Sequence, residues 1–206
     1  MELVDLSKNL SIPQKSKPKI LLVIDNSSNS VGGMEISFIR HVRLLIDFIE
    51  VIPVSVCLET DDNNYQGKLY YYSKEGIRGY SILISDDFQS EKNDLLYSCV
   101  THFLIDIAKI EQIDGIQIYG AYQLLPFSCG LAANYLNIPY IISFRGSDFN
   151  VRIYHSQFNH LIKSIELASI CTFVNTESLN QFLNLFPAIK AKLIYNYTNV
   201  SDFVIF

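Results

Sequence analysis

The chain has 206 residues, of which 49% are hydrophobic and 18% charged, and its formal charge is −5. This composition is typical of one compact α/β domain with enough apolar material for a core, and the chain is short for two full domains. A net negative charge argues against a nucleic-acid partner, which needs a basic face. A local anion site made of backbone N–H groups does not depend on net charge and stays possible.

The cysteines and histidines show no spacing that is typical of a metal site. No CxxC or HExxH pattern occurs, so we predict no metal. Each cysteine lies in or beside an apolar run, which favours four buried free thiols in a reducing compartment: Cys57, Cys99, Cys129 and Cys171. The first residues lack a signal-peptide core, and no run approaches the roughly 18 apolar residues that span a membrane. We therefore expect a soluble, cytoplasmic protein, with residues 1–18 as a flexible tail.

The first half of the chain alternates apolar runs with helical spacing. Lys19–Asp25, "KILLVID", predicts a buried parallel strand. Helical spacing follows over Gly33–Ile49, with this apolar side: Ile36, Ile39, Val42, Leu45, Ile46 and Ile49. The next predicted elements are a strand Val51–Glu59, two short strands Lys68–Ser73 and Tyr80–Ser85 that could form a hairpin, and a helix Ser90–Ile110.

The second half continues this alternation. Its predicted strands are Gly115–Gly120, Ile138–Phe144, 169–175 and Ala191–Asn196. Its predicted helices are Leu124–Leu136, Phe149–Ala168 and Thr176–Leu185. The βαβα order with short turns predicts a single α/β domain with an open, mostly parallel, Rossmann-like sheet and helices on both faces, a three-layer sandwich.

In such sheets, ligands bind beyond the carboxyl ends of the strands. Four loops fall on that edge: "NSSNSVGG", "YGAY", "FRGSD" and "NTES". The glycines of the first, Gly32 and Gly33, precede a helix whose unpaired N–H groups and dipole suit a phosphate. A tight strand-to-helix turn without a ligand fits equally well. "SVGGME" has neither the GxGxxG spacing of a dinucleotide site nor a following GK[ST].

The other loops carry side chains with more than one possible role. Arg145 could bind a phosphate or carboxylate in bidentate fashion, or form a plain surface salt bridge. Gly146 allows a sharp exit from the strand. Asp148 could cap the next helix or accept a sugar hydroxyl. Tyr119 and Tyr122 could offer hydrogen bonds to a sugar, but in a chain with thirteen tyrosines ordinary packing is an equal alternative.

Taken in order, the motifs resemble a known family. "GGME" follows the first strand, and then come "DGIQIYG", "LAANYLNIPYIISFRGSD", "ASICTFVNTES" and "AKLIYNYTNVSDF". This series is similar to the N-terminal domain of family 4 glycosyltransferases, the retaining type with two facing Rossmann-like (GT-B) domains. The resemblance runs from about Lys19 to Phe203. Each motif alone is weak, and their order and spacing carry the resemblance.

The resemblance implies two groups of site residues. Gly32, Gly33, Met34 and Glu35 match the loop that lies against the donor diphosphate or the acceptor. Tyr119 and Arg145 stand where many members have a histidine, and Asn175 stands where a serine is usual. The full set expected in the cleft is Tyr119, Tyr122, Arg145, Gly146, Ser147, Asp148, Asn175 and Asn196. No residue of the chain stands out as a nucleophile, so the catalytic residues stay unassigned.

The resemblance also implies a function and partners. We expect residues 19–196 to be the acceptor-binding half of a retaining hexosyltransferase-type enzyme of polysaccharide biosynthesis. Residues 197–206 would start the linker to a donor-binding C-terminal domain, which acts in cis or trans and without which the chain is inactive. The nucleotide-sugar is a co-substrate and no cofactor is expected. The acceptor would be a glycan or lipid-linked, and weak contact with the inner face of the membrane is possible.

Two alternatives stay open at this point. The first is a non-catalytic subunit of a split glycosyltransferase that binds a glycan or acceptor for another chain. The second is an unrelated Rossmann-like enzyme with a nicotinamide cofactor, against which the glycine spacing argues.

Overall fold

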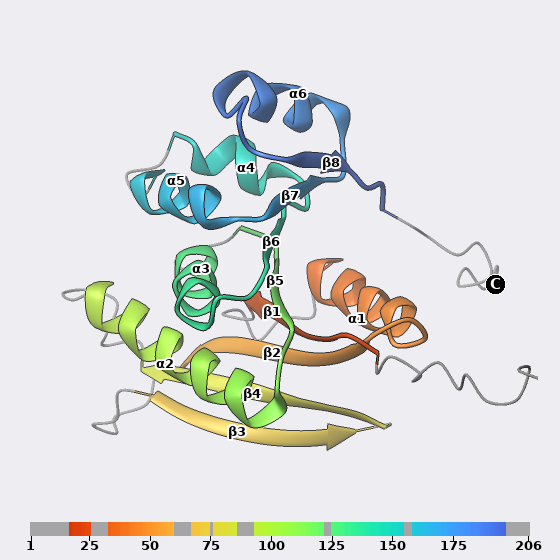
Figure 1. Cartoon of the computed structure of the whole chain (residues 1–206), viewed down its shortest axis with the longest axis vertical. Helices are drawn as coiled ribbons and strands as arrows, with labels where there is room; N and C mark the ends of the chain where they lie inside the picture. Colours follow the sequence, from red (N-terminus) through yellow and green to blue (C-terminus); the bar gives the residue numbers. More distant parts are fainter. Residues whose placement is uncertain are drawn as a thin grey trace, which may run out of the picture.

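The computed structural model describes residues 17–25, 33–59, 67–74, 76–85, 93–121, 125–154 and 158–196. Within them, one eight-stranded sheet has the order β3-β4-β2-β1-β5-β6-β7-β8 (Figure 1). Its strands are β1 (Lys19–Asp25), β2 (Glu50–Glu59), β3 (Gly67–Lys74), β4 (Ile77–Ser85), β5 (Gly115–Tyr119), β6 (Tyr140–Ser143), β7 (Ile170–Phe173) and β8 (Ala191–Leu193). Only the β3–β4 hairpin pairs antiparallel among these strands, so the prediction of an open, mostly parallel sheet is confirmed.

Helices cover both faces of this sheet. They are α1 (Gly33–Leu45), α2 (Asn93–Glu111), α3 (Leu125–Leu136), α4 (Ser147–Arg152), α5 (Phe158–Leu167) and α6 (Thr176–Leu185). Helix α1 lies on one face, and α2, α3 and α5 lie together on the other (Figure 1). In the described part of the chain, no helix is long and apolar enough to cross a membrane.

Strand β1 shows why the core has two parts. Its residues from Leu21 to Asp25 are all buried, as expected for a central parallel strand. Because side chains alternate along a strand, Leu21 and Val23 join the large cluster under α2 and α3, while Leu22 and Ile24 face α1. Burying each such side chain contributes about 1.5–3 kcal/mol to the free energy of unfolding.

Helix α1 buries only part of the predicted apolar side. Phe38 and Val42 are buried against β1 and β2, whereas Ile36, Ile39 and Ile46 are more than 40% exposed. Met34 and Leu45 are partly buried and extend this row, which follows the three- and four-residue spacing of a helix face. The isoleucines have the same spacing but lie on the flank and far side. Periodicity alone therefore predicted the helix and not its orientation.

The single helix predicted over Phe149–Ala168 is divided into α4 and α5, with residues 155–157 outside the described part. The two helices pack against different partners. Phe149 of α4 is fully buried among the rings of Phe144, Phe173 and Phe182. Helix α5 packs instead on α3. Helix α4 ends at Arg152, and the next two residues form a turn.

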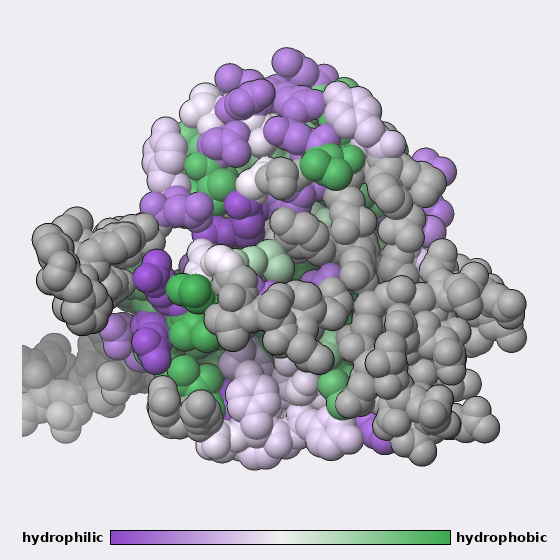
Figure 2. Space-filling model, turned by 180° about the vertical axis from the view of Figure 1, so that it is seen from behind, coloured by the Kyte–Doolittle hydropathy of each residue, from purple (hydrophilic) through white to green (hydrophobic). Residues whose placement is uncertain are grey.

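The far edge of the sheet carries a row of exposed tyrosines. Tyr70, Tyr71 and Tyr72 of β3 are all at least one-third exposed. Figure 2 shows pale, weakly polar side chains gathered at this end of the molecule, opposite the more hydrophilic end near α6 and β8.

Gly79 fixes the hairpin against the sheet. A Cβ atom at this position would lie 2.6 Å from the Pro53 carbonyl oxygen and 2.6 Å from the Tyr72 hydroxyl. We therefore expect Gly79→Ala to lower the free energy of unfolding by about 1–3 kcal/mol in urea denaturation, because the strands must separate. Gly33→Ala is the matched control, since nothing lies within 4 Å of its added Cβ. Equal stability of the two variants would contradict the close packing at Gly79.

Candidate functional site

The candidate site lies at the carboxyl edge of the sheet, where β5, β6 and β7 end side by side. Tyr119, Ser143 and Thr172 are register partners across these three strands. Their side chains share the face that α1 covers, since Tyr119 packs in the cluster of that helix. The Gly120 N–H donates to the Ser143 carbonyl at 2.8 Å, which joins the loops after β5 and β6.

Asp148 organises the loop after β6. Its buried carboxylate accepts hydrogen bonds from the backbone N–H groups of Arg145, Gly146 and Phe149, at 2.9–3.1 Å. It also accepts from the N–H of Ala121, after β5, at 2.9 Å. Burial raises the pKa of Asp148, and these donors oppose the rise. One side chain thus holds the Phe144–Asp148 loop together and fastens it to the neighbouring loop.

The first turn of α4 starts differently from the predicted cap. The N-cap is Gly146, which makes no side-chain cap bond, and Asp148 lies inside the first turn. The φ of Gly146 is +156°, a conformation that side chains rarely adopt. The sharp exit from β6 expected at this glycine is therefore present.

Tyr119 is a buried ring that faces both α1 and the loop after β6. Its hydroxyl lies 2.6 Å from the Ser37 hydroxyl, and its ring meets Phe38 edge-on with centroids 5.5 Å apart. Only 1% of Tyr119 is exposed, so packing describes its ring better than an open platform does. Its ring also contacts the guanidinium of Arg145, whose Cζ lies 4.4 Å from the ring centroid.

Arg145 joins three segments that are distant in the sequence. Its guanidinium contacts the Tyr119 ring, as described above. Its Nη2 donates to the Ser37 hydroxyl at 3.5 Å and to the Asn196 side-chain oxygen just after β8. No carboxylate pairs with it among the described residues, so the alternative of a plain surface salt bridge is not seen there. The guanidinium is half-buried and keeps its full charge.

His41 completes the group and was not predicted. Its ring packs on Tyr119 with centroids 5.3 Å apart, and its buried Nε2 has no hydrogen-bond partner in the described structure. Burial and the nearby Arg145 charge lower the pKa of His41 from 6.5 to about 4, so the ring is neutral at pH 7. Ser37 and His41 are four residues apart on α1, and this spacing was the available signal.

The structure places the other predicted residues separately. Asn175 is the N-cap of α6 and accepts from the Ser178 N–H at 2.8 Å. Gly33, Met34 and Glu35 form the first turn of α1, where Met34 packs against the core. Ser147 begins α4. Gly32 and Tyr122 lie outside the described residues. Of the predicted set, the structure therefore brings together Tyr119, Arg145, Gly146, Asp148 and Asn196.

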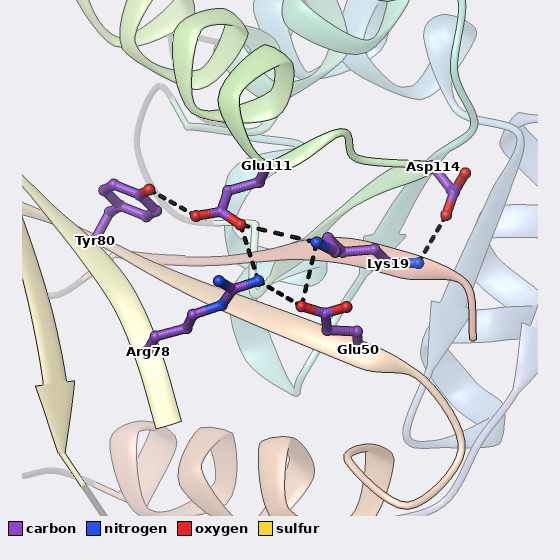
Figure 3. Close-up of polar contacts among 6 residues, drawn as sticks. All are labelled: Lys19, Glu50, Arg78, Tyr80, Glu111 and Asp114. Atoms are coloured by element: carbon purple, nitrogen blue, oxygen red, sulfur yellow. Dashed lines mark hydrogen bonds and ion pairs between the residues drawn. The ribbon is translucent and has the colours of Figure 1, made fainter. Parts of the chain in front are cut away.

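A second polar cluster lies at the opposite, amino edge of the sheet (Figure 3). Its members, each within reach of at least one other, are Lys19, Glu50, Arg78, Tyr80, Glu111 and Asp114. Arg78 contacts both glutamates, Glu50 at 2.6 Å and Glu111 at 3.1 Å. Burial and the bond to Glu111 raise the pKa of Tyr80 to about 12. Here every cation faces a carboxylate, unlike Arg145.

Comparison with known proteins finds solved structures of similar fold and no matching family. No family model matches this chain, and neither does any curated protein. The E. coli trehalose-6-phosphate structure with bound UDP-2-fluoro glucose matches with a TM-score of 0.59 and 14% identity, over 89% of this chain and 50% of that one. At this identity, the likeness is one of fold alone.

Two further GT-B structures show the same extent of likeness. UDP-N-acetylglucosamine 2-epimerase from Rickettsia bellii matches with a TM-score of 0.54 and 10% identity, over 87% of this chain and 45% of that one. A UDP-forming trehalose-phosphate synthase from Burkholderia xenovorans matches with a TM-score of 0.51 and 13% identity, over 87% and 48%. This chain thus spans about half the length of the GT-B structures that it resembles.

Proposed function

We propose that this chain is the N-terminal, acceptor-binding half of a retaining glycosyltransferase. The complete enzyme would move a sugar from a nucleotide-sugar to a hydroxyl of a glycan or lipid-linked acceptor. The observation that carries this proposal is the joined group of Tyr119, Arg145 and Asp148 at the carboxyl edge. These are positions at which the sequence motifs place the acceptor cleft, and the sheet belongs to a fold that glycosyltransferases use.

Each part of the site has a role in this proposal. Catalysis requires the acceptor oxygen to be held beside the anomeric carbon, which calls for a rigid wall. The Asp148 hydrogen bonds give the loop after β6 that rigidity. Catalysis also requires stabilisation of the charge on the departing diphosphate. The N-terminus of α1, which begins at Gly33, supplies a positive dipole end at the same edge.

The donor would be bound by a second Rossmann-like domain, in cis or in trans. Support for this comes from the likeness, which covers about half of each solved structure. In this arrangement the carboxyl edge described above forms one wall of the cleft and the second domain forms the other. Without that second domain, the residues described above would bind acceptor and would not turn over.

An NMR titration followed by a transfer assay tests the proposal. Oligosaccharide acceptors should shift the backbone amides around Ala121 and Arg145–Phe149 in the ¹⁵N-labelled chain. Transfer from a nucleotide-sugar should appear only when a donor-binding domain is fused or added. Arg145→Ala should then lower kcat/KM by about 100-fold because the guanidinium that lines the cleft is lost. Lys109→Ala, an exposed residue of α2, should leave transfer unchanged.

Three results would overturn the proposal. The first is epimerisation of a nucleotide-sugar without transfer, because GT-B epimerases share this fold. The second is acceptor-induced shifts that lie away from the carboxyl edge. The third is undiminished transfer by the Arg145→Ala variant.

A further inference from the structure

Within the described structure, the positive charge of Arg145 has no anionic partner, and part of its guanidinium donates no hydrogen bond. Both of its side-chain hydrogen bonds come from Nη2, and both acceptors, the Ser37 hydroxyl and the Asn196 amide oxygen, are neutral. The other donors of the guanidinium, on Nη1 and Nε, have no partner among the described residues. At the amino edge, by contrast, Arg78 contacts two carboxylates.

The guanidinium is also held in a fixed position. Its Cζ lies over the Tyr119 ring, and that ring is in turn fixed by Ser37 and Phe38. Among the described residues, this contact and the Nη2 hydrogen bonds leave Nη1 and Nε free to donate. An arginine edge fits two oxygens of a phosphate or carboxylate, and little side-chain freedom would be lost on binding here.

We propose that Arg145 binds a phosphate group of a substrate and that Asn196 occupies this place when the substrate is absent. The proposal rests on the proposed function for its substrate, although phosphate binding itself does not. The neutral amide oxygen of Asn196 accepts a hydrogen bond from Arg145 where a phosphate oxygen would do so. An anionic phosphate oxygen would form a stronger hydrogen bond with the guanidinium than the amide oxygen does.

Because Asn196 occupies the position proposed for the phosphate, phosphate binding competes with the contact between Arg145 and Asn196. Asn196 is exposed and follows β8, so it can leave Arg145 without disturbing the core. Phosphate would then bind only the fraction of molecules in which Asn196 has moved away. Bound phosphate would in turn release the Asn196 side chain from Arg145.

Inorganic phosphate is the first probe, titrated into the ¹⁵N-labelled full chain. We expect amide shifts around Arg145 and saturation in the millimolar range. Arg145→Gln should weaken binding about tenfold or more because charge-assisted bonds are lost. Asn196→Ala should tighten it by about two- to tenfold because the internal competitor is gone. Lys109→Gln removes the same charge from an exposed position on α2 and should change nothing.

Further ligands distinguish the source of the phosphate. Stronger binding of glucose 6-phosphate than of either phosphate or glucose would point to a phosphorylated acceptor. Stronger binding of UDP would point to the donor diphosphate. Both outcomes require Arg145 and support the proposal.

Unchanged phosphate binding in Arg145→Gln would overturn the anion site, leaving an adventitious ion only. Weaker binding in Asn196→Ala would overturn the role of Asn196. Phosphate binding without transfer in the complete enzyme would contradict the proposed function and leave this inference standing.

Discussion

Asp148→Asn should lower the free energy of unfolding by about 3 kcal/mol, among the largest losses for any single substitution in this chain. The carboxylate accepts hydrogen bonds from four backbone N–H groups, those of Ala121, Arg145, Gly146 and Phe149. An asparagine has one acceptor oxygen, and its amide nitrogen would face donors. Because the site is buried, the N–H groups left unpaired would not reach water.

Urea denaturation measures this loss, with Asp106→Asn as the matched control. Asp106 is exposed on α2, and the same change there should alter the free energy of unfolding by no more than about 0.5 kcal/mol. The amide resonance of Ala121 should also move in Asp148→Asn. A loss as small as that of the control would show that the carboxylate does not hold the two loops together.

The second large effect is a loss of stability at acidic pH. His41 has a folded-state pKa of about 4, below its ordinary value of 6.5, because burial and Arg145 disfavour its charged form. Between these values the unfolded chain binds more protons than the folded one, so the free energy of unfolding falls as pH drops from about 6.5 to about 4. We expect His41 to account for about 2 kcal/mol of that fall, less than the full shift implies, because the ring is partly exposed.

His41→Phe isolates this contribution because it keeps a ring and removes the titration. Relative to the wild type, its free energy of unfolding should decline less between pH 6.5 and 4, while the two pH profiles run parallel above pH 7. An NMR titration of the His41 ring gives the folded pKa directly. A midpoint near 6.5 would mean that neither burial nor Arg145 disfavours the charged ring.

Elements with a strong local pattern were predictable from the sequence. The apolar run Lys19–Asp25 and the helix Thr176–Leu185 have the predicted bounds. The parallel order then placed the carboxyl-end loops on one edge, and the motif resemblance selected Tyr119, Arg145 and Asp148 within them.

Features that depend on which distant segments pack together were not predictable from local sequence patterns. The buried side of α1 is decided by β1 and β2, and three isoleucines of the predicted apolar side, Ile36, Ile39 and Ile46, are exposed instead. The break between α4 and α5 follows from their different neighbours. The contact between Arg145 and Asn196 joins positions 51 residues apart, and the burial of His41 depends on a strand far along the chain. No local pattern encodes such contacts.

The two edges of the sheet differ in how their charges are compensated, and this difference affects how an anionic ligand would arrive. The amino edge neutralises its own cations, and the chain as a whole carries a formal charge of −5. At a distance, a phosphate-bearing molecule therefore meets a weakly repulsive protein. The attraction of Arg145 extends only about 8–10 Å at physiological ionic strength. Encounter would gain nothing from long-range steering, so added salt should not slow association, in contrast to basic anion-binding proteins.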